Sequence, residues 1–349
     1  MAPQTMKQWN VVKTGSFDEG LKFSEGPVPS KLQDNQVLVR IHGASLNFRD
    51  LIIVLGKYPF PQRENVVPAS DGAGVVEAVG QAVTRFKPGD KVLTLFNQGH
   101  LAGSLTPETG ATGVGGTVDG TLRQYGAYDE QGLVHMPSNL NFLEGATLTC
   151  AGLTAWNALY GLSSAAIKPG DWVLTQGTGG VSVFALQFAK AAGCKVISTT
   201  SSQEKADRLK KLGADHVLNY KEDQNWGETA KKLTPGGLGV NHVVEVAGPV
   251  TMKQSLKAIK IDGVISIIGF VAGQTKDQPT FLDCLTNIAT ARGVLVGSRM
   301  QFEEMNRAVE AADLHPVVDS KVFKLEDIKE AYKYQFEQGH FGKVCIQID

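Results

Sequence analysis

The amino-acid sequence predicts an α/β protein of two domains, one rich in β-strands and one built on a doubly wound parallel sheet. Three observations support this fold class. The length of 349 residues suits two domains of about 150 residues each. The N-terminal third has the pattern of short strands separated by glycine-rich turns. After Leu133, short apolar runs alternate with helical patterns, which is typical of a parallel sheet covered on both faces.

The N-terminal part supplies the strand-like segments. VLVRIHGASL (37–46) alternates apolar and polar residues, as a half-buried strand does. DGAGVVEAVG (71–80) and KPGDKVL (87–93) continue this pattern, with glycines at the expected turns. Residues 96–120 show little periodicity and predict a long loop that borders a pocket. GKVCIQID (342–349) predicts a final strand that rejoins the N-terminal domain.

The second part of the chain repeats a strand–helix unit. The apolar runs are rich in Val and Ile, and a helical pattern of polar and apolar residues follows most of them. We therefore expect a Rossmann-type sheet within residues 132–299 and a β-rich domain formed by 1–131 and 300–349. The expected strands are 172–176, 195–200, 216–220, 242–246, 263–269 and 293–298, and the expected helices are 180–192, 202–212, 224–233, 250–260 and 279–291.

The composition argues against several classes of function. The formal net charge is −1, which gives no support for a nucleic-acid partner or an anionic membrane surface. No apolar run approaches the roughly 20 residues of a membrane span. The four cysteines are far apart in the sequence, and the N-terminus lacks a charged start followed by an apolar core. We therefore expect reduced thiols and a cytoplasmic location.

A glycine-rich motif, GTGGVS (177–182), stands between an expected strand and an expected helix. At such a junction, backbone N–H groups and the helix dipole favour a pyrophosphate. The common dinucleotide fingerprint has glycine in the sixth place, where this chain has Ser182. Because serine is also small, it allows close packing of helix on strand. The motif predicts cofactor contacts from Gly177, Gly179, Gly180 and Val181.

The segment after the second expected strand indicates which dinucleotide binds. NAD-specific sites place Asp or Glu there for the ribose 2′-hydroxyl, but KVISTTSSQEK has no acid at the strand's tip. Ser201 and Ser202 offer hydroxyls and Lys205 offers a cation, which suits a 2′-phosphate. The alternatives are that Lys205 only solvates a helix face and that Glu204 opposes the phosphate. The segment favours NADPH over NADH.

Several motifs together resemble the medium-chain dehydrogenase/reductase superfamily over nearly the whole chain. These motifs are SLNFRDLIIVLGKYP (45–59), VPASDGAGVVEAVG (67–80), FKPGDKV (86–92), CAGLTAWNAL (150–159), QGTGGVSVFALQFAKAAG (176–193), SSQEKADRLKKLGADHVLNY (201–220) and HFGKVCIQI (340–348). The resemblance implies a GroES-like catalytic domain followed by a Rossmann cofactor domain.

The resemblance also bears on zinc. At the positions where zinc-containing members have a Cys, a His and a third ligand, this chain has Asn47, Ser70 and Cys150. Asn and Ser are poor substitutes for a thiolate and an imidazole. The loop 96–120 lacks the cysteines of the structural zinc lobe. Rescue of a metal site by His100 stays an alternative, but we expect no metal and a likeness to the zinc-independent quinone and enoyl reductases.

The resemblance assigns roles to further residues. Tyr58 matches a tyrosine that donates a proton in some enoyl reductases and forms a pocket wall in quinone reductases; simple packing beside Pro59 is the alternative. Asn47 matches an asparagine near the nicotinamide ribose and the substrate, with a turn-stabilising role as the alternative. Further cofactor contacts are expected from Thr154, Tyr220, Ala247, Gly248, Gly269, Phe270, Ser298 (at the end of the sixth expected strand) and Lys343.

The function implied is a zinc-independent, NADPH-dependent reductase of enones, enoyl compounds or quinones. Such a reaction needs little more than positioning and a proton donor, because the negative charge spreads over an enolate. Phe60 and Phe270 are candidates for the pocket of a flat conjugated substrate. Alternatives are a carbonyl or alcohol oxidoreductase, an NADPH-binding protein with little turnover, and an enoyl reductase that serves a synthase. The segment GVLVGS (293–298) resembles one through which family members extend their sheet across a dimer, so a homodimer is expected, with a tetramer as the alternative.

Overall fold

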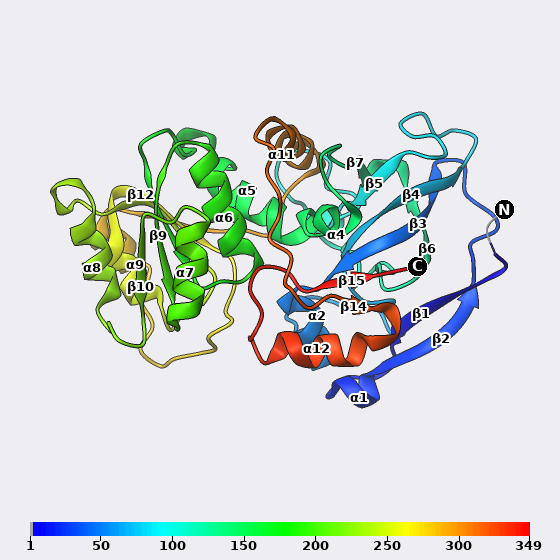
Figure 1. Ribbon diagram of the computed structural model, residues 1–349, viewed down its shortest axis with the longest axis horizontal. Helices are drawn as coiled ribbons and strands as arrows, with labels where there is room; N and C mark the ends of the chain where they lie inside the picture. The colour runs from blue at the N-terminus through cyan, green and yellow to red at the C-terminus, as the bar shows by residue number, and fades with distance from the viewer. Residues whose placement is uncertain (1–2) are drawn as a thin grey trace. The chain divides into compact units, whose positions relative to one another are not determined.

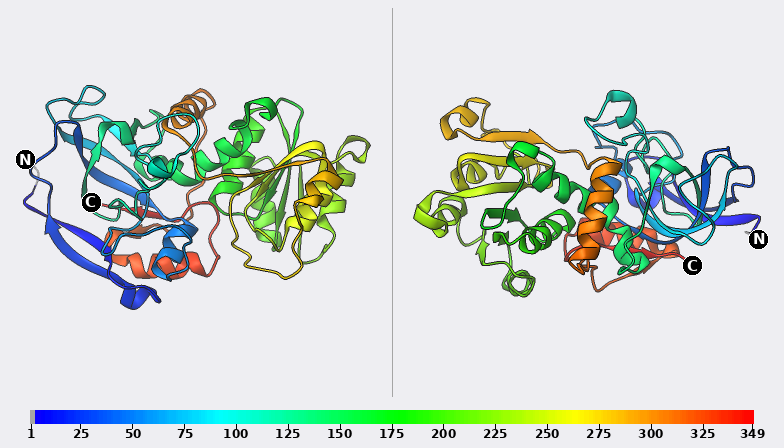
Figure 2. Two further views of the ribbon diagram at one scale, coloured as in Figure 1. Left: turned by 180° about the vertical axis from the view of Figure 1, so that it is seen from behind. Right: turned by 90° about the horizontal axis from the view of Figure 1, so that it is seen from above.

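The computed structural model describes residues 3–349 and divides into two compact units (Figures 1 and 2). Unit 1 comprises the residues up to Leu153 together with Gly297–Asp349, and unit 2 is Thr154–Val296. The predicted pairing of a β-rich domain with a parallel-sheet domain is confirmed. Among the described residues, no helix is both long enough and apolar enough to cross a membrane.

The boundaries between the units differ from the predicted ones. Residues 132–153 belong to unit 1 rather than to the parallel-sheet domain. The reason is pairing: β7 (Leu133–His135) is antiparallel to β5 (Lys91–Thr94) in the first sheet. Helix α4 (Phe142–Ala146) packs on the same sheet, where a Cβ on Gly43 would lie 2.6 Å from the carbonyl oxygen of Phe142. Only glycine permits that close approach.

Unit 1 is built on a seven-stranded sheet in the order β14-β15-β3-β4-β5-β7, with β6 also paired to β3. The predicted C-terminal strand is confirmed as β15, whose Cys345 lies opposite Ser45 of β3. The strands are β3 (Gln36–Ser45), β4 (Asp71–Val79), β6 (Tyr125–Asp129), β14 (Phe323–Lys324) and β15 (Cys345–Gln347), besides β5 and β7; β1 (Thr5–Val11) and β2 (Leu21–Pro27) form a separate hairpin. The helices are α1 (Phe17–Gly20), α2 (Phe48–Val54), α3 (Pro107–Gly110), α4, α11 (Arg299–Ala311) and α12 (Ile328–Phe336).

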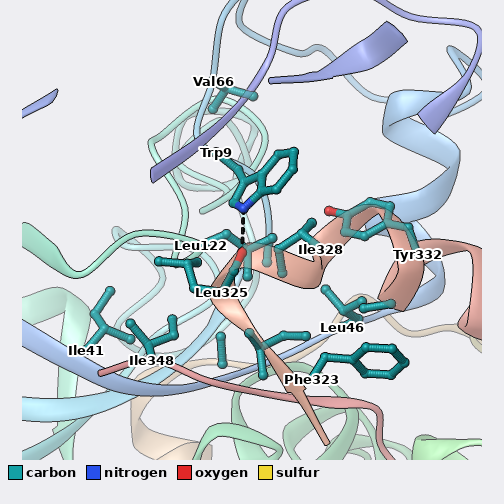
Figure 3. Close-up of a cluster of buried hydrophobic side chains, with 14 of the residues drawn as sticks. Trp9, Ile41, Leu46, Val66, Leu122, Phe323, Leu325, Ile328, Tyr332 and Ile348 are labelled. Atoms are coloured by element: carbon teal, nitrogen blue, oxygen red, sulfur yellow. Dashed lines mark hydrogen bonds between the residues drawn. The ribbon is translucent and has the colours of Figure 1, made fainter. Parts of the chain in front are cut away.

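The hydrophobic core of unit 1 joins the two ends of the chain (Figure 3). Trp9 of β1 is buried against the C-terminal segment, and its indole Nε1 donates a hydrogen bond to the carbonyl oxygen of Leu325 at 2.6 Å. Ile328 and Tyr332 on the C-terminal helix α12 belong to the same buried cluster as Trp9. This core holds α2 and β15 in place, and both of these elements carry or adjoin predicted site residues.

Unit 2 contains six parallel strands in the order β10-β9-β8-β11-β12-β13, which is the doubly wound order of dinucleotide-binding domains. Figure 1 shows the strands between α6 and α7 on one side and α8 and α9 on the other. The strands are β8 (Trp172–Gln176), β9 (Lys195–Thr200), β10 (His216–Asn219), β11 (Val240–Glu245), β12 (Ile259–Ile267) and β13 (Thr290–Gly293). The helices are α5 (Leu153–Tyr160), which begins at the last residue of the first segment of unit 1, α6 (Gly180–Ala191), α7 (Gln203–Lys211), α8 (Trp226–Leu233), α9 (Met252–Ala258) and α10 (Leu282–Asn287).

The first five predicted strands are confirmed, but the sixth was placed too late. The prediction was 293–298, whereas β13 is Thr290–Gly293 and pairs with β12 from Thr290 onward. Val294 and Val296 are apolar because they are buried, not because they belong to the sheet. Helix α10 is correspondingly shorter than the predicted 279–291.

Candidate functional site

The glycine turn after β8 leaves its backbone open. Gly177 has a φ of +72°, a left-handed conformation that favours glycine. A Cβ on Gly177 or on Gly179 would meet no heavy atom within 4 Å, so a ligand can approach the main chain there. Gly179 is the N-cap of α6 and has no side chain to satisfy the first N–H groups of that helix. The turn therefore fits a pyrophosphate.

Ser182, the departure from the common fingerprint, has a structural role. Its side chain is buried, and its Oγ donates a hydrogen bond to the carbonyl oxygen of Gln176 at 2.6 Å. This bond ties the first turn of α6 to the last residue of β8. The Ser182 hydrogen bond thus links the two ends of the glycine turn and leaves the backbone of Gly177 and Gly179 open.

The residues predicted to bind the adenosine end gather where β9 and β10 finish. The backbone N–H of Tyr220 donates to the carbonyl oxygen of Thr200 at 3.1 Å, so the two strand ends lie side by side. Ser202 caps α7, where its Oγ accepts from the N–H of Lys205 at 3.4 Å. Ser201, Ser202 and Lys205 are half-buried, and Tyr220 is exposed. Their role toward a 2′-phosphate stays a prediction.

The turns after β11 and β12 form one surface with each other. The N–H of Val271 donates to the carbonyl oxygen of Val246 at 3.3 Å, and that of Ala272 donates to Ala247 at 3.1 Å. Gly248 has a φ of +91°, and a Cβ on it would lie 2.8 Å from the Cα of Phe270. The predicted contacts Ala247, Gly248, Gly269 and Phe270 therefore come together at the carboxyl edge of the sheet, where ligands bind in this fold.

Unit 1 holds a buried polar cluster around Lys343. This side chain is 3% exposed. Its Nζ donates to the carbonyl oxygen of Leu46 at 2.6 Å, to Asn47 Oδ1 at 2.5 Å and to Asp71 Oδ2 at 3.3 Å. Asn47 Nδ2 in turn lies 3.4 Å from Ser70 Oγ. The side chain of Asn47 therefore joins Lys343 to Ser70.

Asp71 is the anion that balances Lys343. The carboxylate is fully buried, accepts from Ser45 Oγ at 2.8 Å, and accepts from Ser70 Oγ at 2.7 Å. These partners all belong to unit 1, and they come from β3, the start of α2, β4 and the segment before β15. Lys343 was predicted to approach the cofactor; its ammonium group is held by three acceptors of unit 1.

A second buried ion pair lies next to Tyr58. Arg49 Nη1 is 3.3 Å from Asp50 Oδ1 and donates to the carbonyl oxygen of Val114 at 2.9 Å. Arg49 Nε donates to Tyr58 Oη at 3.4 Å, and the guanidinium also stacks on the rings of Tyr58 and Phe96. Burial raises the pKa of the Asp50 carboxyl to about 6 even though Arg49 opposes that shift. Tyr58 is half-buried, and its ring also lies 5.3 Å from that of Phe60, measured between ring centroids.

The residues at the positions of the family's zinc ligands make contacts with other protein groups. The Asn47 amide oxygen already faces an ammonium group. His100 Nε2 is 3.0 Å from the carbonyl oxygen of Gly103. Within residues 3–349, no group of three or more His, Cys, Asp and Glu side chains is arranged to hold a metal.

Ser298 lies elsewhere than expected, whereas Thr154 lies on a helix as expected. Ser298 does not end a strand: it is the N-cap of α11 in unit 1, where its Oγ accepts from the N–H of Gln301 at 3.3 Å. Thr154 is a buried residue in the first turn of α5 and the first residue of unit 2. For both, the predicted contact with the cofactor stays a prediction.

The sequence analysis did not single out four buried charged residues: Arg49, Asp50 and Asp71 in the polar clusters of unit 1, and Glu245 in unit 2. A signal was available for the first two, because FRDLIIV places two charges at the start of an apolar helix. Buried charges must be paired or hydrogen-bonded, and paired charges cluster at functional sites. Asp71 and Glu245 stand in apolar strands and carry the same signal.

Comparison with known proteins shows matches along both units. A model described as the alcohol dehydrogenase GroES-like domain matches residues 33–138, and one described as zinc-binding dehydrogenase matches residues 180–311. A zinc-type alcohol dehydrogenase-like protein of Schizosaccharomyces pombe is 48% identical over 95% of this chain and 96% of its own length. The quinone oxidoreductase of Sus scrofa is 30% identical over 92% of this chain and 90% of its own length.

A solved structure agrees with these matches. A protein of Sinorhizobium meliloti 1021 described as a putative alcohol dehydrogenase superposes with a TM-score of 0.90 at 40% identity, covering 99% of this chain and 100% of that one. The predicted fold class, a GroES-like domain followed by a Rossmann domain, is therefore confirmed.

Proposed function

The chain belongs to the medium-chain dehydrogenase/reductase superfamily of NAD(P)-binding oxidoreductases, and from this premise we propose that it is a zinc-independent, NADPH-dependent reductase of activated carbon–carbon double bonds or quinones. The observation that carries the proposal is the cluster of Asn47, Ser70 and Lys343. An ammonium group stands on the amide oxygen at a position where zinc-containing members have a ligand. Without a Lewis acid, acceptors that spread negative charge are the easiest to reduce.

Unit 2 supports binding of the cofactor. When bound, NADPH supplies a hydride, a hydrogen nucleus with two electrons, to the acceptor carbon. The open backbone at Gly177 and Gly179 would hold the pyrophosphate. Ser201, Ser202 and Lys205 would hold the phosphorylated ribose of the adenosine, and the preference for NADPH rests on the cation of Lys205 and on the lack of an acid in 195–202.

Unit 1 supports proton transfer by Tyr58. A guanidinium group has no acceptor, so Arg49 donates to Tyr58 Oη and the phenol's own proton is directed elsewhere. As hydride adds to the β-carbon of an enone, the π electrons move toward the oxygen. The Tyr58 proton passes to that developing enolate, and the adjacent Arg49 cation stabilises the phenolate that remains.

A second candidate is a carbonyl or alcohol oxidoreductase that uses Tyr58 in the same way. The specific observation in its favour is that the Schizosaccharomyces pombe and Sinorhizobium meliloti proteins, at 48% and 40% identity, carry alcohol dehydrogenase names. An NADPH-binding protein with little turnover is the third possibility that the experiment separates.

The test measures NADPH oxidation by chelator-treated protein with quinones, enones, enoyl thioesters and saturated aldehydes, and with NADH in parallel. We expect turnover of an enone or quinone with NADPH that chelation does not reduce. Activity confined to aldehydes supports the second candidate. Activity lost on chelation contradicts zinc independence, and binding of NADPH without any turnover contradicts the enzyme proposal.

Substitution of one hydroxyl group tests Tyr58. Tyr58→Phe is expected to lower kcat on the best acceptor by about a hundredfold, because it removes a general acid, while the dissociation constant for NADPH stays the same. Tyr334→Phe is the matched control, because it removes a phenol hydroxyl of unit 1 that donates to Asp319 at 2.9 Å, away from Arg49. Equal kcat values for Tyr58→Phe and wild type contradict the assignment.

We also propose that the chain forms a homodimer through β13. This strand is the last in the sheet order of unit 2, so one edge of it is unpaired within the described residues. Apolar side chains of the segment that precedes it in the chain, at the start of and within α10, are exposed, with Phe281 97% and Leu285 71% accessible. An exposed edge with apolar neighbours is a site for pairing with another chain. Sedimentation equilibrium of wild type and Leu285→Glu tests this, and a wild-type monomer contradicts it.

A further inference from the structure

We propose that Glu245 and Gln176 are positioning residues that lock three turns of unit 2 into one rigid cofactor frame. The cofactor frame is defined as the glycine turn 177–179, the turn 246–251 after β11 and the turn 268–272 after β12. This inference rests on the proposed function, which supplies the dinucleotide. It assigns a role to a buried acid that stands outside the Tyr58 and Lys343 clusters.

Glu245 is a buried carboxylate surrounded by neutral hydrogen-bond donors. It is 0% exposed and ends β11. Oε1 accepts from the N–H groups of Ala247 at 3.1 Å and Gly248 at 2.9 Å, and from Thr251 Oγ1 at 2.7 Å. Oε2 accepts from Gln176 Nε2 at 2.7 Å and from Ser255 Oγ. A buried charge is costly unless it is this fully hydrogen-bonded.

The chemistry explains why a carboxylate stands here. Five donors converge on one side chain, and only an ionised carboxyl group offers two acceptor atoms and no donor. Three of those donors belong to the turn that follows β11, so Glu245 fixes the path of its own succeeding backbone. Hydrogen bonds to a charged acceptor are stronger than neutral ones.

Gln176 extends this hold to the glycine turn. It is the last residue of β8 and directly precedes Gly177. Its Nε2 donates to Glu245 and also to Ser255 Oγ at 2.9 Å. Its Oε1 lies 3.3 Å from the N–H nitrogen of Val246 and 3.4 Å from that of Ala247. Its own carbonyl oxygen is the acceptor for Ser182 at the start of α6.

The turn after β12 is connected to the turn after β11 by backbone hydrogen bonds. Val271 and Ala272 donate to the carbonyl oxygens of Val246 and Ala247, so the turn after β12 rests on the turn that Glu245 holds. The strands β8, β11 and β12 are neighbours in the sheet. The cofactor frame therefore carries six of the predicted contacts (Gly177, Gly179, Ala247, Gly248, Gly269 and Phe270), whereas the predicted contacts to the adenosine end lie outside it, after β9 and β10.

This division predicts a selective defect. In Glu245→Gln one end of the side chain becomes an NH₂ group, which faces either the donors of the turn 246–251 or the amide of Gln176. The turns of the cofactor frame then lose their common acceptor. NADPH, which needs the whole frame, binds more weakly, whereas 2′,5′-ADP, which reaches only the adenosine end, binds as before.

Exchanging the two side chains at positions 176 and 245 gives every donor of the network an acceptor again. In the double variant Gln176→Glu/Glu245→Gln, the amide oxygen introduced at position 245 accepts from Ala247, Gly248 and Thr251. The amide nitrogen at position 245 donates to the side chain at position 176 and to Ser255, and the Ser255 hydroxyl donates to the carboxylate introduced at position 176. The other oxygen of that carboxylate accepts from Val246 and Ala247. The charge and the number of donors are unchanged, so affinity for NADPH is expected to return.

The experiment measures dissociation constants for NADPH and for 2′,5′-ADP (or for NADH and ADP, if wild type prefers NADH) by calorimetry. Glu245→Gln is expected to weaken NADPH binding about tenfold, the effect of losing about one hydrogen bond to a charged group. Binding of 2′,5′-ADP stays within about twofold of the wild-type value. Glu228→Gln, an exposed glutamate of unit 2 that pairs with Lys257 at 2.9 Å, is the matched control and leaves both constants unchanged.

Each other outcome has one meaning. If Glu245→Gln does not fold, Thr251→Val carries the test, because it removes one donor and is expected to weaken NADPH binding in the same direction and by less. Equal weakening of NADPH and 2′,5′-ADP, or a double variant no better than Glu245→Gln, overturns the cofactor frame and leaves the proposed function standing. Failure of wild type to bind either dinucleotide overturns both.

Discussion

The Arg49 and Lys343 clusters of unit 1 and the Glu245 network of unit 2 bury charge in different ways. In unit 1, Arg49 pairs with Asp50 and Lys343 pairs with Asp71, so each of these four buried charges has a counter-ion. Unit 2 buries the anion of Glu245 among neutral N–H and O–H groups. The cost of burying a paired charge is offset by its counter-ion, whereas the cost of burying the Glu245 carboxylate is offset by hydrogen bonds from several neutral groups.

This difference has a consequence for function. Removing one member of a pair leaves its partner uncompensated, so unit 1 is sensitive to single charge changes. In unit 2 the same change loosens a set of turns and leaves no opposite charge behind. We therefore expect defects in these two ion pairs to appear as loss of stability, and defects around Glu245 to appear first as loss of ligand affinity.

The largest expected effect breaks the balance in unit 1. Lys343→Met leaves Asp71 buried with the hydroxyls of Ser45 and Ser70 as its side-chain donors. We expect the free energy of unfolding to fall by about 3 to 5 kcal/mol, the usual cost of leaving one buried charge unpaired. Denaturant titration of the unit 1 transition measures it.

Two further variants check that charge balance is the cause. Adding Asp71→Asn to Lys343→Met removes the stranded anion and is expected to recover part of the loss. Lys13→Met, which breaks an exposed ion pair with Glu19, is the control and should change stability by less than about 1 kcal/mol. A Lys343→Met protein as stable as this control would contradict the role given to the pair.

A smaller loss of stability is expected when the hydrogen bond that links the two ends of the glycine turn in unit 2 is removed. Ser182→Ala removes the buried hydrogen bond to the Gln176 carbonyl oxygen, whose distance is 2.6 Å. We expect a loss of about 1 to 2 kcal/mol in the free energy of unfolding of unit 2, the cost of one buried bond and an unsatisfied acceptor. Thermal unfolding measures it, with Ser201→Ala, a half-buried serine nearby, as the control. No difference between the two variants would show that Ser182 is only a small filler.

The smallest expected effect is at an ion pair near the surface of unit 2. It tests whether burial, rather than the unit in which a pair lies, decides how much the pair contributes to stability. Asp215 lies near the surface of unit 2 beside Lys190 at 2.7 Å and Lys195 at 2.9 Å. Burial raises the pKa of its carboxyl, but hydrogen bonds from both ammonium groups outweigh burial and lower that pKa to about 2. Because the folded pKa is below the unfolded value, the pair stabilises the folded state above pH of about 4 and loses this contribution as pH falls toward 2.

The measurement compares Asp215→Asn with wild type from about pH 7 to about pH 3, a range that spans the unfolded pKa of an aspartate. At neutral pH the variant should be less stable by no more than about 1 kcal/mol, as for other surface pairs, and the difference should shrink below a pH of about 4. Asp207→Asn, an exposed aspartate of α7 that accepts from Gln203, serves as the control. A difference that grows on acidification would mean that the sign of the Asp215 shift is wrong.

Local patterns were sufficient for most of unit 2. The runs WVLTQ and KVISTT coincide with β8 and β9, and the glycine motif lies at the predicted strand–helix turn. Such elements are short, and their periodicity and glycines are local properties of the chain. The sixth strand was misplaced because the burial of Val294 and Val296 has the same pattern as a buried strand.

The sequence by itself therefore determined the fold class, the succession of strands and helices along the chain and the open glycine turn, because each depends on neighbouring residues. Only the tertiary structure decided the site. Lys343 meets Asn47 and Asp71 because β15 pairs with β3, and Gln176 meets Glu245 because β8 lies beside β11. Residues 69 to 296 positions apart in the chain come into hydrogen-bond distance only after the sheets form, and no local pattern records which polar groups those sheets will bury together.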